Sequence, residues 1–234
     1  MANRIQKLVL RQRRLFHDVS HEVRSPLARI DVALELARVD PKHIPSSLDR
    51  IEKEVHAIDR LIEGLLTYAR LEDSAELPTR PISARQLVET VREAIAFEGR
   101  TRSVKATLRD HLAEDIIFKA NEDALLSALG NLARNALRYT PDGGEVHLEL
   151  DRGPQSLILR CRDEGPGMPA AELNHIFDPF VRGSREKTGT GFGLGLAIAQ
   201  SAVKSQGGTI SVKNVQPHGL EFTISLPLHP SAAS

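Results

Sequence analysis

The sequence lacks the features that mark several common classes of protein. It has a single cysteine, Cys161, so no internal disulfide can form, and its cysteine and histidine residues do not have the spacing of zinc ligands. Its 31 basic and 31 acidic side chains cancel, so no net charge attracts nucleic acid or an anionic membrane. No apolar run approaches the roughly 20 residues that span a bilayer, and the first residues lack the apolar centre of a signal peptide. These absences favour a folded cytoplasmic protein that binds no nucleic acid and makes no membrane contact by itself.

Two apolar stripes of helical period occupy the first third of the chain. Apolar residues recur at steps of three or four from Ile5 to Ala37, and the same alternation runs from Leu48 to Ala69. The segment 39–47 between them has two prolines and ends in serines suited to a helix N-cap, which predicts a hairpin turn. Two helices cannot enclose a core on their own, which favours a dimeric four-helix bundle. The alternative is a long coiled-coil hairpin packed on the rest of its own chain.

The pattern changes after a polar stretch with two prolines at 73–83, which is typical of a linker. We therefore expect a first domain at 1–75 and a second at 78–234. The second domain alternates helices and strands, which is typical of a layer of helices on a mixed sheet. Helices are predicted at 83–98, 121–139, 170–176 and 193–206, and strands at 104–108, 115–119, 145–151, 156–163, 209–214 and 220–227. The predicted fold class is thus α plus α/β.

The first helix carries an exposed histidine in the segment FHDVSHEVRSPL, residues 16–27. His21 lies about 200° round the helix from Val19 of the apolar stripe, so its imidazole faces solvent. A neutral imidazole has one nitrogen with a free lone pair, and Glu22 is an adjacent carboxylate that could hold the other N–H. Pro26 removes its own N–H from the helix, so we expect a bend beside His21. The alternative is a solvated surface histidine, as His17 on the same face.

The predicted helix at 121–139 presents polar side chains on one face. About a third of its circumference carries Asn131, Asn135, Arg138 and Tyr139, and the nearly opposite face carries Leu125, Leu129, Leu132 and Ala136. Amide oxygens suit a hard ion such as Mg²⁺, a guanidinium suits phosphate, and a phenol ring can cover a base. The alternative is an ordinary amphipathic helix whose polar residues face water.

A carboxylate, Asp163, ends the inward-facing apolar row of the predicted strand at 156–163. A carboxylate in that position needs a hydrogen-bond donor, which an adenine amino group could supply. Gly165 and Gly167 follow it directly and remove side chains where a ligand could approach the backbone. The alternative is a glycine-rich turn with no ligand.

A long loop precedes the last predicted helix. Its basic residues are Arg182, Arg185 and Lys187, and the glycines at the helix start are Gly189, Gly191, Gly193 and Gly195. Loops of this length in compact domains are commonly lids, and backbone N–H groups at a glycine-rich helix start can cradle phosphate. The GxGxG pattern is weak by itself, because no strand directly precedes it as a dinucleotide-binding site would require.

Taken together and in this order, these segments resemble the bacterial two-component sensor histidine kinases over nearly the whole chain. The segment around His21 looks like the phosphoacceptor box of that family. The later motifs look like its Asn box (NLARNALRYTP, 131–141), first Gly box (DEGPGMP, 163–169), Phe box (FDPFVRG, 177–183) and second Gly box (GTGFGLGLAIAQ, 189–200). The resemblance implies a dimerisation and phosphotransfer hairpin followed by an ATP-binding α/β sandwich, as in gyrase, mismatch-repair and heat-shock chaperone ATPases.

The resemblance also implies roles for individual residues. His21 would take the γ-phosphoryl group of ATP, with Glu22 as its base. Asn135 would bind Mg²⁺, supported by Asn131. The implied nucleotide site further contains Arg138, Tyr139, Asp163 at the adenine amino group, Gly165, Gly167, Phe180 and Arg182 of the lid, and Gly189, Gly191, Gly193 and Gly195 along the phosphates. The implied cofactors are ATP and Mg²⁺, and the implied partners are a second copy of the chain and a response regulator whose aspartate accepts the phosphoryl group.

One departure from the family concerns Ser25, where many relatives carry Thr or Asn. Ser25 lies one helical turn after His21 on the same exposed face, so its hydroxyl could orient a water that dephosphorylates the regulator. The alternative is a small residue beside the bend at Pro26. The chain also contains no sensor or membrane segment, so the resemblance implies the cytoplasmic portion of a longer, inner-membrane sensor.

Two other functions compete with a kinase. An ATPase without phosphotransfer would need the second domain but not an exposed His21–Glu22 pair on a dimerising hairpin. An inactive dimeric scaffold would be expected to have lost Asn135, Asp163 or the lid glycines, which are all present. Both comparisons favour the kinase.

Overall fold

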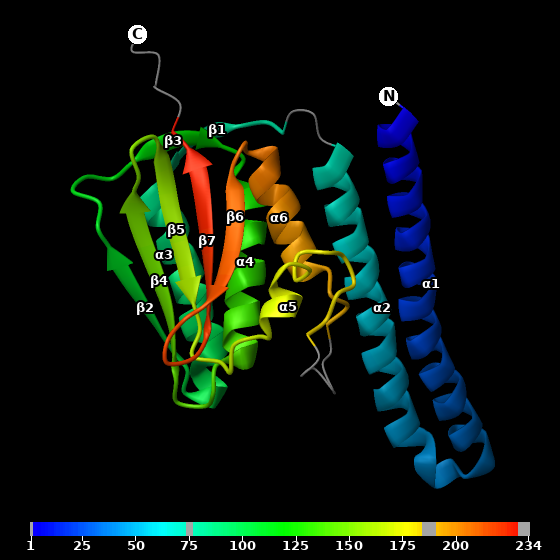
Figure 1. Cartoon of the computed structure of the whole chain (residues 1–234). Coiled ribbons are helices and arrows are strands. Elements are labelled where there is room, and N and C mark those ends of the chain that lie inside the picture. Colours follow the sequence, from blue (N-terminus) through cyan, green and yellow to red (C-terminus); the bar gives the residue numbers. More distant parts are fainter. Residues whose placement is uncertain (1, 74–76, 184–190, 229–234) are drawn as a thin grey trace. The chain divides into compact units, whose positions relative to one another are not determined.

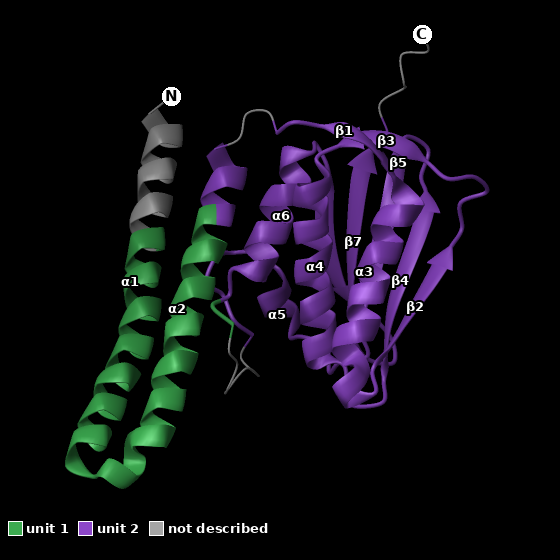
Figure 2. Cartoon of the chain, turned by 180° about the vertical axis from the view of Figure 1, so that it is seen from behind, with its two compact units in different colours: residues 1–66, 186–192 green, residues 67–185, 193–234 purple. Residues whose placement is uncertain are grey.

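The computed structural model describes residues 2–73, 77–183 and 191–228, with side chains described from residue 15 onward (Figure 1). The chain divides into two compact units (Figure 2). The first contains residues 1–66 and 186–192, and the second contains residues 67–185 and 193–234.

The first unit is a helical hairpin, which confirms this part of the predicted fold. It contains α1 (Ala2–Val39), a short 3₁₀ helix η1 (Pro41–His43) and α2 (Ile44–Asp73), whose residues up to Leu66 belong to this unit. The turn begins where the side chain of Asp40 accepts a hydrogen bond from the backbone N–H of Lys42 at 3.0 Å. α1 continues through Pro26; the bend expected there stays a prediction.

The turn is shorter than predicted, and the serine N-cap is wrong. α2 already begins at Ile44, and Pro45 lies in its first turn, where a missing N–H costs no helical hydrogen bond. Ser46 donates its hydroxyl to the carbonyl of His43 at 3.0 Å, and Ser47 is buried within the helix. Prolines occur both in loops and in the first turn of a helix. The sequence pattern alone did not distinguish between these two possibilities.

The apolar stripe of the hairpin divides into two rows. The inner row is half-buried or buried and contains Val23, Ile30, Ala33, Ile51, Ile58 and Leu61. The outer row contains Leu27 and Leu34 on α1 and Leu48, Val55 and Ile62 on α2, seven residues apart on each helix and 41–60% exposed. A seven-residue repeat is the spacing of a helical seam, so the outer row is suited to burial against a second copy.

The second unit contains a mixed sheet. Its helices are α3 (Ala84–Glu98), η2 (Gly99–Arg102), α4 (Glu122–Tyr139), α5 (Ala170–Leu173) and α6 (Gly195–Ser205). Its strands are β1 (Arg80–Ser83), β2 (Lys105–Asp110), β3 (Ile117–Ala120), β4 (Glu145–Arg152), β5 (Ser156–Arg162), β6 (Thr209–Asn214) and β7 (Leu220–Pro227). The five-stranded sheet has the order β2-β4-β5-β7-β6, with β2 parallel to β4 and the other pairs antiparallel.

Helices α3, α4 and α6 cover one face of this sheet, as Figures 1 and 2 show from opposite sides. Burial alternates strictly along β4, β5 and β7, so one face of each strand packs on the helices. Fully buried side chains come from both layers, among them Leu157 and Phe222 from the sheet and Leu125 and Leu132 from α4. This two-layer sandwich confirms the predicted α/β domain.

Two local predictions in this unit need correction. The stretch 73–83, predicted to be a linker, contains β1, which pairs antiparallel with β3 in a separate two-stranded sheet. β1 contains Pro81. A proline argues against a strand when only the sequence is considered, but an edge strand tolerates it. The helix predicted at 170–176 is only the four residues of α5.

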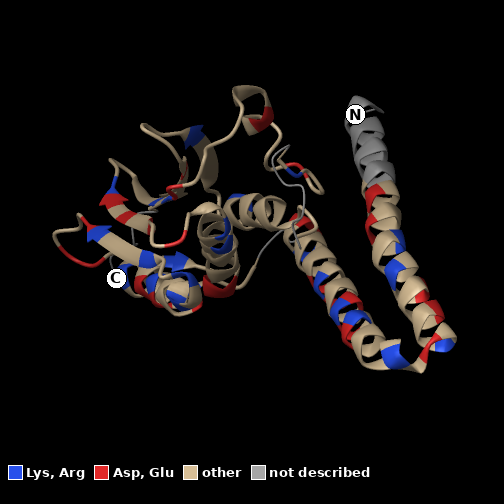
Figure 3. Cartoon of the chain, turned by 90° about the horizontal axis from the view of Figure 1, so that it is seen from below, with Lys and Arg blue, Asp and Glu red and all other residues tan. Residues whose placement is uncertain are grey.

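Charged residues of both signs are interspersed along α2 and the described part of α1 (Figure 3). Such mixing leaves the described part of the hairpin without a field of a single sign. Within the described ranges, no helix is both long enough and apolar enough to cross a membrane.

We expect residues 1–75 alone to form a helical dimer and residues 78–234 alone to be monomeric, because only the hairpin leaves an apolar seam exposed. Light scattering at micromolar concentration measures both. In the full chain, Val55→Asp places a charge in the outer row and should give monomers, whereas Lys53→Asp at an exposed position of α2 should not. A monomeric hairpin, or a dimeric Val55→Asp chain, would contradict the bundle.

Candidate functional site

A buried carboxylate lies just beyond the end of β5. Asp163 is 1% exposed and follows the buried row of Leu157, Leu159 and Cys161, as the period of two predicted. Its Oδ1 accepts hydrogen bonds from the backbone N–H groups of Gly165 at 2.8 Å and Leu220 at 3.1 Å. Its Oδ2 is buried and has no partner among the described residues. One oxygen is therefore held by the fold, and the other is available to a donor from a ligand.

Burial governs the ionisation of this region. It raises the pKa of Asp163, while the two backbone N–H groups oppose that rise. Burial, and then the neighbouring Asp163, raise the pKa of the Cys161 thiol to about 12. Cys161 thus stays protonated at neutral pH and acts as an apolar packing residue, not as a nucleophile.

The first glycines after Asp163 allow close packing within the protein. A Cβ on Gly165 would lie 3.0 Å from the Cβ and carbonyl oxygen of Tyr139, at the end of α4. Gly167 has a φ of +68°, and a Cβ there would lie 2.6 Å from Oδ1 of Asn214. The predicted glycines are thus required by α4 and by the end of β6, which is a different reason from the ligand access that the sequence suggested.

The last residue of β6 and the turn that follows it contribute contacts that the sequence analysis missed. Asn214 accepts a hydrogen bond from the N–H of Met168 at 2.9 Å and donates one to its carbonyl at 2.8 Å. Gly219 has a φ of +111°, and a Cβ there would lie 2.0 Å from the carbonyl oxygen of Asp163. Gly219 itself was visible in the sequence. Its contact with Asp163 was not, because no spacing in the sequence relates residues that lie about 50 positions apart.

The polar face of α4 is divided between engaged and available groups. Asn131 donates to the carbonyl of Ser127 at 2.9 Å and accepts from Arg134 at 3.0 Å. Asn135 has a buried Nδ2 that has no partner within the described part of the chain. The exposed Arg138 guanidinium lies 5.8 Å from the centre of the half-buried Tyr139 ring. Asn135 therefore has unused hydrogen-bonding capacity, whereas Asn131 is bonded within its own helix.

The loop after α5 is closed at its base. The N–H of Phe180 donates to the carbonyl of Gly193 at 3.0 Å, and a Cβ on Gly193 would lie 2.7 Å from the carbonyl carbon of Phe180. Phe180 has a φ of +63°, a conformation that costs a non-glycine residue roughly 1–2 kcal/mol. Such strain persists only where the surroundings impose it, and it is common at functional sites.

The remaining loop residues are placed only in part. Gly195 begins α6 beside Asn131, since a Cβ there would lie 3.0 Å from the Asn131 Oδ1. Gly191 is half-buried and Arg182 is exposed. The predicted Gly189, Arg185 and Lys187 lie outside the described residues.

The hairpin presents the predicted phosphoacceptor to solvent. His21 is exposed, and its ring centre lies 4.5 Å from that of His17 in an edge-to-face arrangement. Glu22 beside it is half-buried. Exposure of the imidazole agrees with the helical geometry predicted from the sequence.

Ser25 has partners that the sequence analysis did not foresee. Its Oγ accepts a hydrogen bond from Nη1 of Arg29 at 2.6 Å. Arg29 in turn binds both carboxylate oxygens of Glu54 on α2, at 2.7 and 2.8 Å. The spacing of four between Ser25 and Arg29 was visible in the sequence, but the pairing with Glu54 depends on the register of the hairpin.

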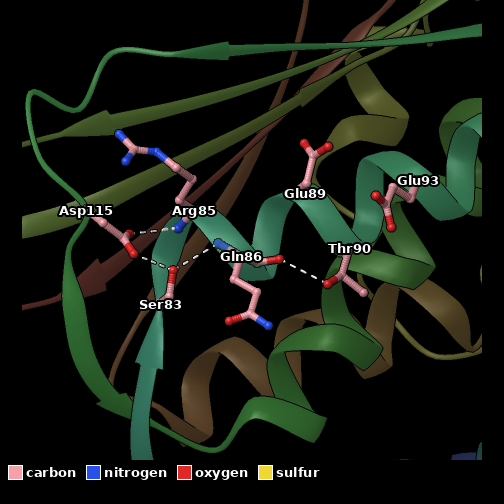
Figure 4. A pocket seen from close by; sticks show the side chains of 7 residues that line it. All are labelled: Ser83, Arg85, Gln86, Glu89, Thr90, Glu93 and Asp115. Carbon is pink, nitrogen blue, oxygen red and sulfur yellow. Dashed lines mark hydrogen bonds between the residues drawn. The ribbon is translucent and has the colours of Figure 1, made fainter.

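A separate hollow of about 400 Å³ lies at the start of α3 (Figure 4). Its lining residues are Ser83, Arg85, Gln86, Glu89, Thr90, Glu93 and Asp115. Ser83 accepts the N–H of Gln86 at 3.0 Å, and Asp115 accepts the N–H of Arg85 at 3.1 Å. These bonds cap the helix, and the hollow contains none of the predicted site residues.

Comparison with known proteins matches both units. Residues 11–74 match the His Kinase A (phospho-acceptor) domain. Residues 120–230 match the histidine kinase-, DNA gyrase B- and HSP90-like ATPase domain. The sensor protein PfeS of Pseudomonas aeruginosa is 36% identical over 228 residues, which are 97% of this chain and 49% of PfeS.

Solved structures give the same result. The full-length ShkA structure in complex with AMPPNP has a TM-score of 0.70 at 26% identity and covers 94% of this chain and 47% of ShkA. The histidine kinase ThkA, in complex with the response regulator TrrA, has a TM-score of 0.76 and covers 98% of this chain and 67% of ThkA. Because the sequence identity to ThkA is only 20%, this similarity shows the fold alone.

The chain belongs to the two-component sensor histidine kinases: it combines a hairpin that matches the phospho-acceptor domain with a unit that matches the gyrase- and HSP90-like ATPase domain. The family and fold predicted from the sequence are confirmed. The chain spans about half the length of the curated relatives that it matches.

We predict that Asp163→Asn weakens ATP binding by about tenfold or more, because the amide replaces an acceptor with a donor where the resemblance implies the adenine amino group. Isothermal calorimetry measures the affinity. Asp151→Asn, a half-buried position on β4, is the matched control and should bind as the unmodified chain does. An unchanged affinity of Asp163→Asn for ATP would show that Asp163 does not bind the nucleotide.

Proposed function

We propose that this chain is an ATP-dependent protein histidine kinase that phosphorylates His21 and passes the phosphoryl group to an aspartate of a response regulator. The observation that supports it most directly is the buried Asp163, which has one oxygen bonded by the backbone and one left for a ligand. The match of the hairpin to a phospho-acceptor domain favours phosphotransfer over an ATPase without it.

Asp163 Oδ2 would accept a hydrogen bond from the adenine amino group. The family motif assigns the Mg²⁺ ligand to Asn135, whose amide oxygen would bind the ion, and Asn131 would support it from the same helix face. The buried Nδ2 of Asn135, which has no partner among the described residues, would be a donor toward a phosphate oxygen or a water. When bound, Mg²⁺ supplies charge neutralisation at the phosphate oxygens. The other proposed nucleotide contacts are Arg138, Tyr139, Gly165, Gly167, Phe180, Arg182, Gly189, Gly191, Gly193 and Gly195.

The reaction at His21 would form a bond between a ring nitrogen and the γ-phosphorus. The bond from that phosphorus to the bridging oxygen breaks, and ADP leaves with the electron pair. Glu22 would take the proton from the other ring nitrogen, which keeps the attacking nitrogen nucleophilic. A carboxylate oxygen of the regulator then attacks the phosphorus, and the nitrogen–phosphorus bond breaks. Solvent exposure of His21 supports access by both partners.

Two protein partners are proposed. The exposed outer row of the hairpin supports a homodimer. A response-regulator receiver domain as second partner is supported by the relatives' family and by ThkA, which was solved with TrrA. Binding of ATP is supported by ShkA, which was solved with the ATP analogue AMPPNP.

The proposed location is the cytoplasm, where ATP and regulators are available, as part of a membrane-anchored sensor. Its only thiol, Cys161, is free and buried, which suits a reducing compartment. The relatives named sensor proteins support the assignment to a signalling pathway.

We predict that His21→Gln abolishes labelling of the chain by γ-labelled ATP, while calorimetry still detects ATP binding, because the phosphoacceptor and the nucleotide site lie in different units. His17→Gln, the neighbouring histidine on the same face, is the control and should retain label. Labelled His21→Gln protein would refute the assignment of the phosphoacceptor.

We also predict that Ser25→Ala slows dephosphorylation of the regulator about tenfold, because it loses the hydroxyl that orients the attacking water. The probe is the receiver domain that this chain labels fastest, phosphorylated chemically so that the kinase reaction does not enter the measurement. Equal rates of phosphate release by Ser25→Ala and the unmodified chain would make Ser25 a structural residue only.

A further inference from the structure

A chain of hydrogen bonds links the hydroxyl of Ser25 to the second helix of the hairpin. Arg29 donates from Nη1 to Ser25 Oγ at 2.6 Å, and from Nε and Nη2 to the two oxygens of Glu54 at 2.7 and 2.8 Å. The Arg29 side chain is 42% exposed, whereas that of Glu54 is 14% exposed. Glu54 is thus the buried end of the chain, and Ser25 is the solvent end.

The geometry constrains the serine more than an ordinary surface contact would. A carboxylate that binds two nitrogens of a guanidinium fixes the plane of that group, and therefore also the direction of its third nitrogen. The hydrogen bond with Glu54 raises the pKa of Arg29, and the same bond lowers the pKa of Glu54, so both groups stay charged near neutral pH. By contrast, Arg38–Glu35 on α1 joins two exposed residues of the same helix.

The bond from Arg29 also determines what Ser25 can still do. A serine hydroxyl has one O–H and two lone pairs, and Arg29 occupies one lone pair. The O–H and the other lone pair remain for a water and for a phosphoryl oxygen. Without Arg29 the side chain would exchange among its three staggered rotamers, so the hydroxyl would point at the water only part of the time.

We propose that Arg29, held by Glu54, is a positioning residue that orients the Ser25 hydroxyl for dephosphorylation of the partner regulator. The proposal rests on the proposed role of Ser25. In the reaction, the oxygen of a water bonds to the phosphorus of the aspartyl phosphate, and the bond from phosphorus to the carboxyl oxygen breaks. The aspartate leaves as a carboxylate, inorganic phosphate is released, and a proton from the water passes to solvent.

The first test uses the full chain and the chemically phosphorylated receiver domain described above. Arg29→Gln should lower kcat for phosphate release about tenfold with little change in KM, because docking does not depend on the serine rotamer. Adding Ser25→Ala to Arg29→Gln should cause little further loss, since both changes remove the same oriented hydroxyl. Arg38→Gln, on the same helix, is the matched control and should release phosphate at the unmodified rate.

The second test separates positioning from stabilisation of the hairpin. The double variant Arg29→Glu with Glu54→Arg keeps an ion pair between the helices but places a carboxylate beside Ser25. The unfolding temperature of this double variant should be close to that of the unmodified dimer, while its rate of phosphate release should stay about tenfold lower. Recovery of phosphate release together with the unfolding temperature would show that Arg29 only stabilises the hairpin, and would overturn the proposal.

The outcomes distinguish this proposal from the one beneath it. If Ser25→Ala releases phosphate at the unmodified rate, the role of Ser25 fails and that of Arg29 fails with it. If Ser25→Ala is slow but Arg29→Gln is not, or if the two changes are additive, only the positioning role of Arg29 is wrong. Slow, non-additive variants with unchanged KM support it.

Discussion

The nucleotide-binding unit depends on the burial of one carboxylate. Asp163 links the end of β5 to the glycine loop through Gly165 and to the start of β7 through Leu220, all by one of its two oxygens. The approach of these segments is so close that a side chain at Gly165, Gly167 or Gly219 would collide with its neighbours. A buried acceptor left without a donor costs about 1–3 kcal/mol, so the second oxygen destabilises the free protein by an amount that a bound amino group would remove. In the proposed function, this unpaired oxygen would select a ligand that carries a hydrogen-bond donor.

The hairpin follows a related logic with apolar surface. Its inner row is buried or half-buried, while its outer row of Leu27, Leu34, Leu48, Val55 and Ile62 is left exposed at heptad spacing. Contact with a second copy would bury that row, while His21 and Ser25 lie on positions exposed to solvent. In the proposed function, the same helix would use one surface for dimerisation and a different surface for phosphoryl chemistry. The Arg29–Glu54 ion pair connects the two helices one turn after Ser25.

Periodicity predicted most of this fold, and pairing between distant segments explains what it missed. The buried face of β5 that ends in Asp163, the two faces of α4 and the hairpin all followed from spacing within one element. β1 was not predicted because Pro81 and its neighbours are typical of a linker, and only pairing with β3 makes them a strand. Asn214, Leu220 and Glu54 were missed for the same reason. Each acts on a residue 25 to 57 positions away, and no local pattern encodes the register that brings the two together.

Every step of the proposed function requires that a phosphorus–nitrogen bond forms at His21. The most direct measurement is the chemical stability of the label after incubation with γ-labelled ATP, followed by mapping of the labelled peptide. If His21 is the phosphoacceptor, the label is lost in acid, survives in base and lies on the peptide that contains His21. A label that survives acid, or one that maps to a hydroxyl or carboxyl side chain elsewhere, would contradict it.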